Sequence, residues 1–310
     1  MHGEGGSAGH VQPRSAVRTA LALIIAALVW ASAPQPASAT SARSAAAVPK
    51  LTALTPVTRG SGYVALGDSV TFGYQEPGVS PTPNYLRPAS FRGYPEQLGT
   101  ELHLKVANFS CPGETAASLI NTAAPTYACE NAYRRIYPLH ERYRGSQLQA
   151  AVNYLHRHPG VRLVSLMIGA NDLFRCQKIT ADGCTSQAEQ TATLNGVRRH
   201  VKTILTEIRH RAHYTGQLVV VNYFSLDYSS PAVTRFSVEL NQAQDSAAAP
   251  FRVRVANGFG AFRIASQRFG QHPCLAGLLT QLGSYGTCGV HPSYAGQALL
   301  AKAVATAVRF

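Results

Sequence analysis

The sequence of 310 residues has little charge and almost no tryptophan. Only 14% of its residues are charged and 45% are hydrophobic, which excludes a disordered chain and allows a sizeable core. The single tryptophan, Trp30, lies near the N-terminus. The formal net charge is +13, but no run of five or more lysines and arginines is present. We therefore expect no nucleic acid partner, and at most a weak attraction to anionic surfaces.

Signatures of several other enzyme classes are also missing. The sequence has no H-E-x-x-H, no phosphate-binding P-loop and no G-x-S-x-G elbow. Gly258-Phe259-Gly260 begins like a dinucleotide-binding fingerprint, but Arg263 occupies the place of the third glycine. No C-x-x-C or Cys/His spacing indicates a metal site. We therefore expect neither a metal nor an organic cofactor.

The N-terminal segment has the pattern of a secretory signal peptide. Arg14 and Arg18 precede a short apolar run over residues 20–33, and Ala37-Ser38-Ala39 matches an A-x-A cleavage site. The run is short for a bilayer span, which argues against a membrane anchor. We expect residues 1–39 to be removed and the protein to be secreted and extracellular. Residues 40–60, rich in Ala, Ser, Thr and Pro, predict a flexible lead-in.

The cysteines agree with export. Six cysteines fall into three sequential pairs, whose members are Cys111, Cys129, Cys176, Cys184, Cys274 and Cys288. Six cysteines allow 15 pairings, so their positions alone leave the connectivity open. Pairing each cysteine with its neighbour closes three short loops, which is our prediction for an oxidising compartment.

From residue 61 onward, short apolar runs alternate with helical patterns. Strands are predicted at 63–66, 105–109, 161–168, 217–224 and 251–256, and helices at 94–104, 146–158, 187–213 and 294–308. This alternation predicts one α/β domain over 61–310, with a parallel sheet covered on both faces. The connection 124–145 lacks clear periodicity, and its role stays open.

Ligand sites in such sheets lie at the carboxyl ends of the strands. Polar, glycine-rich turns follow three predicted strands and contain Ser69, Gly113 and Asn171. A serine nucleophile needs a base, and the oxyanion that forms needs hydrogen-bond donors. Ser69 is the candidate nucleophile, while the amides of Ser69 and Gly113 and the side chain of Asn171 are candidate oxyanion donors. His291, before the last predicted helix, is the candidate base in preference to His272.

These residues stand in four blocks that resemble the SGNH (GDSL-type) hydrolase family. The blocks are Gly67-Asp68-Ser69-Val70 with Gly73, Gly113 in Cys111-Pro112-Gly113-Glu114, Gly169-Ala170-Asn171-Asp172, and His291-Pro292 before a helix containing Gly296. The resemblance spans nearly the whole chain after residue 61. It implies a three-layer α/β/α fold with a flavodoxin-like, parallel five-stranded sheet. It also implies an esterase or lipase with Ser69 as nucleophile and His291 as base.

One position departs from the family pattern. The family usually has an aspartate three residues before the histidine, where this sequence has Cys288. A disulfide-bonded cysteine cannot act as an acid, so we expect the backbone carbonyl of Cys288 to orient His291. The alternative is a carboxylate from elsewhere, such as Asp227.

The substrate follows less directly from these patterns. We expect a monomeric lipase or carboxylesterase that acts on a small-molecule or lipid ester. A polysaccharide deacetylase-type carbohydrate esterase and a phospholipase are the alternatives within the same chemistry. A non-catalytic cell-wall binding protein is the rival from another class.

Overall fold

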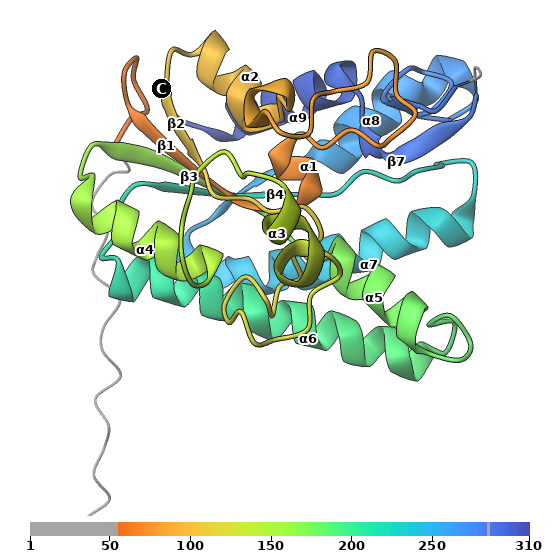
Figure 1. Ribbon diagram of the computed structural model, residues 1–310, viewed down its shortest axis with the longest axis horizontal. Coiled ribbons are helices and arrows are strands. Elements are labelled where there is room, and N and C mark those ends of the chain that lie inside the picture. The colour runs from red at the N-terminus through yellow and green to blue at the C-terminus, as the bar shows by residue number, and fades with distance from the viewer. Residues whose placement is uncertain (1–54, 284–285) are drawn as a thin grey trace, which may run out of the picture. The chain divides into compact units, whose positions relative to one another are not determined.

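A parallel sheet lies at the centre of the computed structural model, which describes residues 55–283 and 286–310 (Figure 1). Its strands are β1 (Gly62–Gly67), β2 (Lys105–Asn108), β3 (Val161–Met167), β4 (Gln217–Val221) and β5 (Arg254–Ala256). They lie in the order β2-β1-β3-β4-β5, and every neighbouring pair is parallel. This is the flavodoxin-like order, so the predicted fold class is confirmed.

Helices cover both faces of the sheet, which explains why its strands are apolar throughout. Figure 1 shows one layer with α1 (Ser69–Phe72), α2 (Tyr94–Glu101), α8 (Gly258–Ser266) and α9 (Tyr294–Ala307). The other layer contains α4 (Gln147–Arg157), α5 (Ala170–Ile179), α6 (Gln187–Thr206) and α7 (Pro231–Ala248). Within these layers α2 packs against α9, and α6 packs against α7.

Local sequence signals account for where several helices begin. The hydroxyl of Ser146 accepts a hydrogen bond from the Gln149 amide and caps α4. Leu148, Val152 and Leu155 then repeat at helical spacing and are buried. Ser186, Ser230 and Ser293 cap α6, α7 and α9 in the same way.

Several elements of the structure were not expected from the sequence. They are α5, α7, α8, α3 (Arg134–Ile136) and the antiparallel pair β6 (Leu279–Gln281) and β7 (Cys288–Pro292). The helix expected at 187–213 leaves α geometry after Thr206 and continues as a π-helical turn over Glu207–Arg211. The segment 124–145 contains a second π turn, Cys129–Tyr133, followed by α3.

The expected signal peptide and most of the expected lead-in lie outside the described residues. The last residues of that lead-in are packed, because Val57 is buried and its amide donates to the carbonyl of Arg309. The folded part therefore includes residues before residue 61. Among the described residues, none of the helices has the length and apolar character needed to span a membrane.

The predicted disulfide pairing is confirmed. The bridges are Cys111–Cys129, Cys176–Cys184 and Cys274–Cys288, with Cα atoms 5.5–5.8 Å apart. The first bridge spans the segment that follows β2, and the third joins the start of β7 to the loop before β6. Two of the three bridges thus hold segments that contain candidate site residues.

Candidate active site

Ser69 begins helix α1 at the carboxyl end of β1, where the sheet order reverses between β1 and β3. The Asp68 carboxylate caps this helix by accepting a hydrogen bond from the Val70 amide at 2.9 Å. The cap fixes the turn that presents the serine. Ser69 is 9% exposed, so it lies at the surface of the core with little contact with solvent.

His291 reaches Ser69 from the other end of the chain. It lies on β7 of the two-stranded sheet, and its Nε2 is 2.8 Å from Ser69 Oγ. A separation of 222 residues is therefore closed by the β6–β7 hairpin. This is the distance that a base needs to take the serine proton.

Glu76 holds the other nitrogen of the imidazole. Its Oε1 lies 2.7 Å from His291 Nδ1 and accepts hydrogen bonds from the amides of Val290 and His291 at 2.7 and 3.1 Å. Its Oε2 accepts from the hydroxyl of Thr280 at 2.5 Å. Because a carboxylate can only accept, the hydrogen of the imidazole is placed on Nδ1, which leaves Nε2 free to accept from Ser69.

These contacts also determine the charge of Glu76. Burial by itself raises the pKa of this carboxyl, but the hydrogen bond and charge of His291 and the hydroxyl of Thr280 outweigh burial and lower its pKa to about 2. Glu76 is therefore ionised at neutral pH. A negative charge in this place is suited to stabilise an imidazolium at His291.

The expectation that the backbone carbonyl of Cys288 orients His291 is wrong, because Nδ1 faces the carboxylate of Glu76 instead. Asp227, the alternative, lies 3.2 Å from Nδ1 of His272 and belongs to a different pair. His272 has no contact with Ser69 among the described residues. The missing aspartate of the last family block is thus replaced by a glutamate seven residues after the nucleophile.

A glycine makes the approach of Glu76 feasible. A Cβ atom added at Gly289 would lie 2.1 Å from Glu76 Oε1, so only glycine leaves room for the carboxylate at the edge of β7. Sequence patterns did not reveal Glu76, since it lies in an irregular segment after α1 and far from His291 along the chain. The signal that was present is the acidic residue beside the nucleophile block, Gln75-Glu76, together with the glycine at 289.

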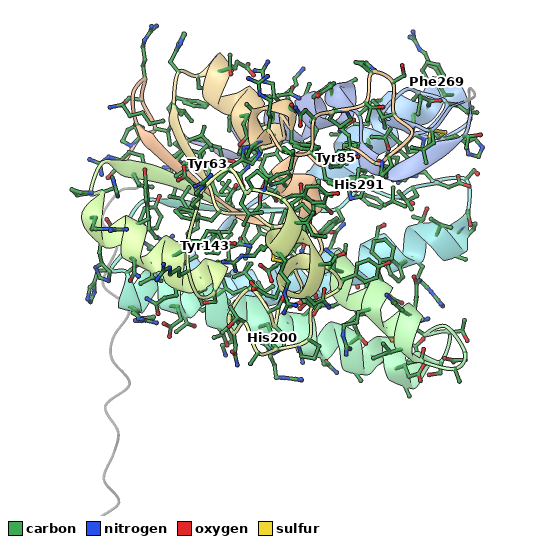
Figure 2. All side chains as sticks on the ribbon, in the orientation of Figure 1. Tyr63, Tyr85, Tyr143, His200, Phe269 and His291 are labelled. Carbon is green, nitrogen blue, oxygen red and sulfur yellow. A yellow bond between two sulfur atoms is a disulfide. The ribbon has the colours of Figure 1, made fainter. Side chains whose placement is uncertain are left out.

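An aromatic cluster borders this triad. The ring of Tyr74 packs edge-on against His291, with centroids 4.9 Å apart, and against Tyr85 at 5.9 Å. Phe72 and Phe91 extend the cluster into the buried interior. Figure 2 shows Tyr85 and His291 among the side chains in this part of the molecule. The cluster fixes the histidine ring from the side and gives the site an apolar wall.

Two backbone amides near Ser69 are free to bind an oxyanion. Among the described residues, no protein group accepts a hydrogen bond from the amide of Ser69 or from that of Gly113. Gly113 has a φ of +82°, and its carbonyl accepts from the amides of Tyr127 and Ala128. A Cβ atom at this position would lie 2.4 Å from that of Ala128. The requirement for glycine is therefore steric as well as conformational.

Asn171 lies in the first turn of α5 and contacts both neighbouring blocks. Its Nδ2 donates to the carbonyl of Glu114 at 3.0 Å, and the same atom lies 3.4 Å from Asp68 Oδ2. One N–H of the amide group thus fixes the loop after Gly113. The second makes only a long contact, so it can turn toward an acceptor on a bound substrate.

A buried hydrogen bond holds Asp68, the residue that precedes Ser69. The hydroxyl of Tyr223 donates to Asp68 Oδ2 at 2.5 Å, and both side chains are buried. Burial raises the pKa of Asp68 to about 6, although the bonds from Tyr223 and Val70 oppose this rise. Asp68 connects the nucleophile turn to Asn171 and to the end of β4, and it braces the site without reaching Ser69 Oγ.

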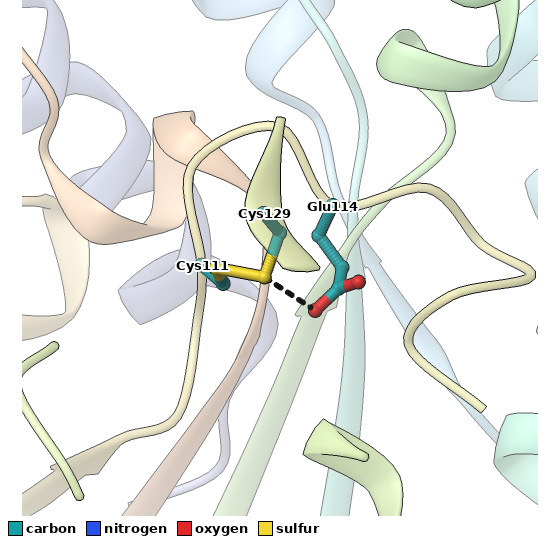
Figure 3. Close-up of side chains that lie close together, drawn as sticks. All are labelled: Cys111, Glu114 and Cys129. Atoms are coloured by element: carbon teal, nitrogen blue, oxygen red, sulfur yellow. Dashed lines mark hydrogen bonds between the residues drawn. A yellow bond between two sulfur atoms is a disulfide. The ribbon is translucent and has the colours of Figure 1, made fainter. Parts of the chain in front are cut away.

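Potential metal ligands are grouped twice in the part of the chain that the structure describes. The groups are Cys111, Glu114 and Cys129, and Cys176, Cys184 and Glu189. Both contain two cysteines joined in a disulfide, whose sulfurs are not thiolates and make poor ligands. Figure 3 shows Glu114 beside the first bridge, with Oε2 3.5 Å from Cys129 Sγ. The sulfur of a disulfide carries no hydrogen, so it cannot donate in this contact, and burial raises the pKa of Glu114 to about 8.

Solved structures share the fold at low sequence identity. LAE5, an alpha/beta hydrolase enzyme from the Lake Arreo metagenome, is 20% identical, with a TM-score of 0.50 over 81% of this chain and 96% of its own. Phospholipase A1 from Streptomyces albidoflavus is 19% identical, with a TM-score of 0.50 over 80% of this chain and 100% of its own. A mutant of Axe2, an acetylxylan esterase from Geobacillus stearothermophilus, is 16% identical, with a TM-score of 0.51 over 81% of this chain and 95% of its own. No curated protein sequence matches the chain.

The family-level match covers much more of the chain than its motifs. The model of the GDSL-like Lipase/Acylhydrolase family matches residues 65–299, which include every residue of the site described above. The sequence blocks, the flavodoxin-like sheet and this match agree with one another. The chain belongs to the GDSL-like lipase/acylhydrolase family and is an ester hydrolase of that family.

Proposed function

We propose that the protein hydrolyses carboxylic esters through an acyl-enzyme, with Ser69, His291 and Glu76 as a catalytic triad. The observation that carries this proposal is the continuous line from Ser69 Oγ to His291 Nε2 (2.8 Å) and from His291 Nδ1 to Glu76 Oε1 (2.7 Å). The three groups have the roles of nucleophile, base and charged orienting group.

In the first half of the reaction, Ser69 Oγ forms a bond to the ester carbonyl carbon while its proton moves to His291 Nε2. The carbonyl oxygen becomes an oxyanion, which accepts hydrogen bonds from the amides of Ser69 and Gly113 and from Asn171 Nδ2. His291 then gives its proton to the alcohol oxygen as the bond from carbon to that oxygen breaks. In the second half, water takes the place of the serine hydroxyl, and the acid leaves with Ser69 restored.

A fluorophosphonate probe tests the assembly of the triad, because it reacts only with an activated serine. We expect the label on Ser69 by peptide mapping and its loss in His291→Ala. We also expect Ser69→Ala to abolish ester hydrolysis while leaving the circular dichroism spectrum unchanged. If Ser69→Ala retained most of the activity, the triad would not be the site of catalysis.

The substrate belongs to the lipase and carboxylesterase class in this proposal, since the aromatic cluster beside His291 gives the site an apolar wall. Carbohydrate esterase and phospholipase activity remain alternatives within the same chemistry. Rates on chromogenic esters of increasing acyl length, compared with rates on acetylated sugars, separate these classes. A non-catalytic wall-binding protein would instead show binding that fades with salt and does not depend on Ser69.

We also propose that the protein is secreted and monomeric. The signal-peptide pattern supports export, as do the three disulfides, which form in oxidising compartments. Cleavage after Ala39 would remove two arginines and one glutamate and leave a net charge of +12. N-terminal sequencing of protein from the culture medium tests the export, and sedimentation tests the oligomeric state.

A further inference from the structure

The amide of Gly113 lies inside a tight turn that is anchored to β1. The turn consists of residues 111–114, and the amide of Glu114 donates to the carbonyl of Cys111 at 3.1 Å. Proline at the second position and a φ of +82° at Gly113 are typical of a type II turn. The amide of Cys111 donates to the carbonyl of Gly67 at 3.2 Å. The first residue of the turn is therefore tied to the end of β1, two residues before the nucleophile.

A buried glutamine side chain makes a second connection between these segments. Gln147 is the first residue of α4, which Ser146 caps, and it is fully buried. Its Oε1 accepts from the amide of Gly67 at 2.7 Å, and its Nε2 donates to the carbonyl of the same residue at 3.0 Å. The same Nε2 donates to Oε2 of Glu114 at 3.2 Å. One side chain thus holds both backbone groups of Gly67 and the carboxyl group at the end of the turn.

Glu114 is fully buried and has no ion-pair partner among the described residues. Its Oε1 is in hydrogen-bond contact with the hydroxyl of Ser118, and its carbonyl accepts from Asn171 Nδ2 at 3.0 Å. Figure 3 shows the same carboxyl group beside the Cys111–Cys129 bridge. A buried carboxyl group costs free energy unless hydrogen bonds hold it. The contacts of Glu114 therefore point to a role in placing the turn, since the reaction steps make no use of its proton.

Burial also keeps this carboxyl group mostly uncharged at neutral pH. It raises the pKa of Glu114 to about 8, although the hydrogen bonds of Ser118 and Gln147 oppose the rise. The charge of Glu130 raises this pKa and that of Arg134 lowers it, and these two residues are paired with each other. A protonated carboxyl group has an accepting oxygen and a donor, as a carboxamide has. Glutamine can therefore replace Glu114 and keep its hydrogen bonds.

We infer that Gln147 and Glu114 are positioning residues, which set the amide of Gly113 at the distance from Ser69 that an oxyanion requires. The two amides lie on separate segments, one after β1 and the other after β2. An oxyanion is stabilised only when its donors lie about 2.7–3.1 Å from one point. Gln147 connects the two segments directly, and Glu114 is its partner in the turn. The inference rests on the proposed function, because both residues act through the oxyanion donors of the same site.

Replacing Gln147 by methionine tests the connection, because methionine keeps the length of the side chain and removes its hydrogen bonds. The kcat for a chromogenic ester should fall by at least about 10-fold, since misplacing a catalytic group by about 1 Å can cost about 100-fold. KM should stay within about 3-fold of the wild type, because the interaction is made in the transition state. Glu114→Ala should have the same effect, and Glu114→Gln should restore kcat to within about 3-fold of the wild type, since the carboxamide keeps the hydrogen bonds.

An inhibitor that forms the oxyanion separates positioning from general damage. Ser69 Oγ adds to the carbonyl carbon of a trifluoromethyl ketone, the serine proton passes to His291, and the carbonyl oxygen becomes an oxyanion that stays bound. In Gln147→Met its Ki should rise by about the factor by which kcat falls, because such a compound resembles the transition state. A fall in kcat with an unchanged Ki would overturn the inference, and so would an unchanged kcat.

Gln217 supplies a matched control at the amino end of β4, opposite the site. It is buried, its Nε2 donates to the carbonyls of Thr55 and Arg309, and its Oε1 accepts from the amide of Arg309 at 2.8 Å. Gln217→Met removes a similar set of hydrogen bonds and should lower the Tm while leaving kcat and Ki unchanged. An equal loss of kcat in Gln217→Met and Gln147→Met would show a general effect on folding and would overturn the inference.

Hydrogen exchange separates this inference from the proposed function. In Gln147→Met, amides in a peptide that covers residues 109–119 should exchange at least about 10-fold faster than in the wild type, because the turn has lost its anchor. In Gln217→Met they should exchange as in the wild type. Unchanged exchange in Gln147→Met overturns the inference, whatever the activity. If the wild type hydrolyses no ester and the fluorophosphonate does not label Ser69, the proposed function fails, while exchange still decides whether Gln147 holds the turn.

Discussion

Replacing Glu76 by glutamine removes one charge from the triad and changes little else. The amide oxygen of the introduced glutamine can occupy the place of Oε1, where it still accepts from Nδ1 of His291 and from the amides of Val290 and His291. The amide nitrogen can then donate to Thr280. The substitution therefore keeps the acceptor that sets the histidine tautomer and removes only the negative charge that faces the imidazolium.

The expected loss follows from the distance between the charges. Two unit charges about 4 Å apart interact by about 1 kcal/mol in water and about 4 kcal/mol near a protein surface. The two side chains are 13% and 16% exposed, so the interaction lies between these limits. A loss of about 2–3 kcal/mol of transition-state stabilisation corresponds to a fall of roughly 30- to 150-fold in kcat. Glu76→Ala also removes the acceptor and should lower kcat by about 10³-fold or more.

The assay is steady-state hydrolysis of a chromogenic ester, with KM and kcat determined separately. KM should change little, because Glu76 has no direct contact with the position of the substrate carbonyl. Glu101→Gln, which neutralises an exposed carboxylate at the end of α2, is the matched control and should keep the wild-type kcat.

A kcat of Glu76→Gln within about 3-fold of the wild type would refute this reasoning. It would mean that a neutral acceptor at Nδ1 is sufficient and that the enzyme works as a serine–histidine dyad. Thermal denaturation of the same variant distinguishes a catalytic loss from a loss of folded protein, because a fall in kcat caused by unfolding would be accompanied by a lower Tm.

Three further outcomes are expected. Gly289→Ala should lower kcat at least as much as Glu76→Gln, measured with the same ester, because the added Cβ takes the place of the Glu76 carboxylate. The free energy of unfolding, measured with urea, should fall from pH 5 to pH 8. Burial raises the pKa of Asp172 to about 7 and that of Glu114 to about 8. Over this pH range the native state therefore retains protons that the unfolded chain has released. Glu114→Gln should reduce this dependence by on the order of 3 kcal/mol, and an unchanged slope would contradict the sign. Replacing Cys111 and Cys129 by serine should cost about 3 kcal/mol of stability and lower kcat, because their bridge closes the loop of Gly113; a kcat equal to that of the wild type would show that the loop needs no bridge.

The stability prediction depends on the direction of these shifts. Asp172 and Glu114 have a higher pKa in the folded protein than in the unfolded chain, since burial disfavours their charged forms. Their effect on stability is therefore most favourable at low pH and is lost as the pH rises through the folded values. Glu76 has the opposite sign, because its pKa is lowered to about 2, and it adds stability that is lost only as the pH falls toward that value.

Local patterns determined much of this protein without the tertiary structure. Apolar runs such as Val161–Met167 predict buried parallel strands, because a strand covered on both faces needs no polar alternation. The glycine-rich turns at Ser69, Gly113 and Asn171 predict a shared site, since the carboxyl ends of parallel strands meet at one edge. The neighbour pairing of the cysteines was predicted from their sequential order, and the bridges confirm it.

The tertiary structure alone decided which carboxylate lies beside His291. Glu76 and His291 are 215 residues apart, and no period or motif connects an irregular segment after α1 with the edge of a two-stranded sheet. Their contact depends on the place of the β6–β7 hairpin and on the missing side chain of Gly289, which are properties of packing in three dimensions. Sequence specified the chemistry of the residues, and packing selected which of them meet.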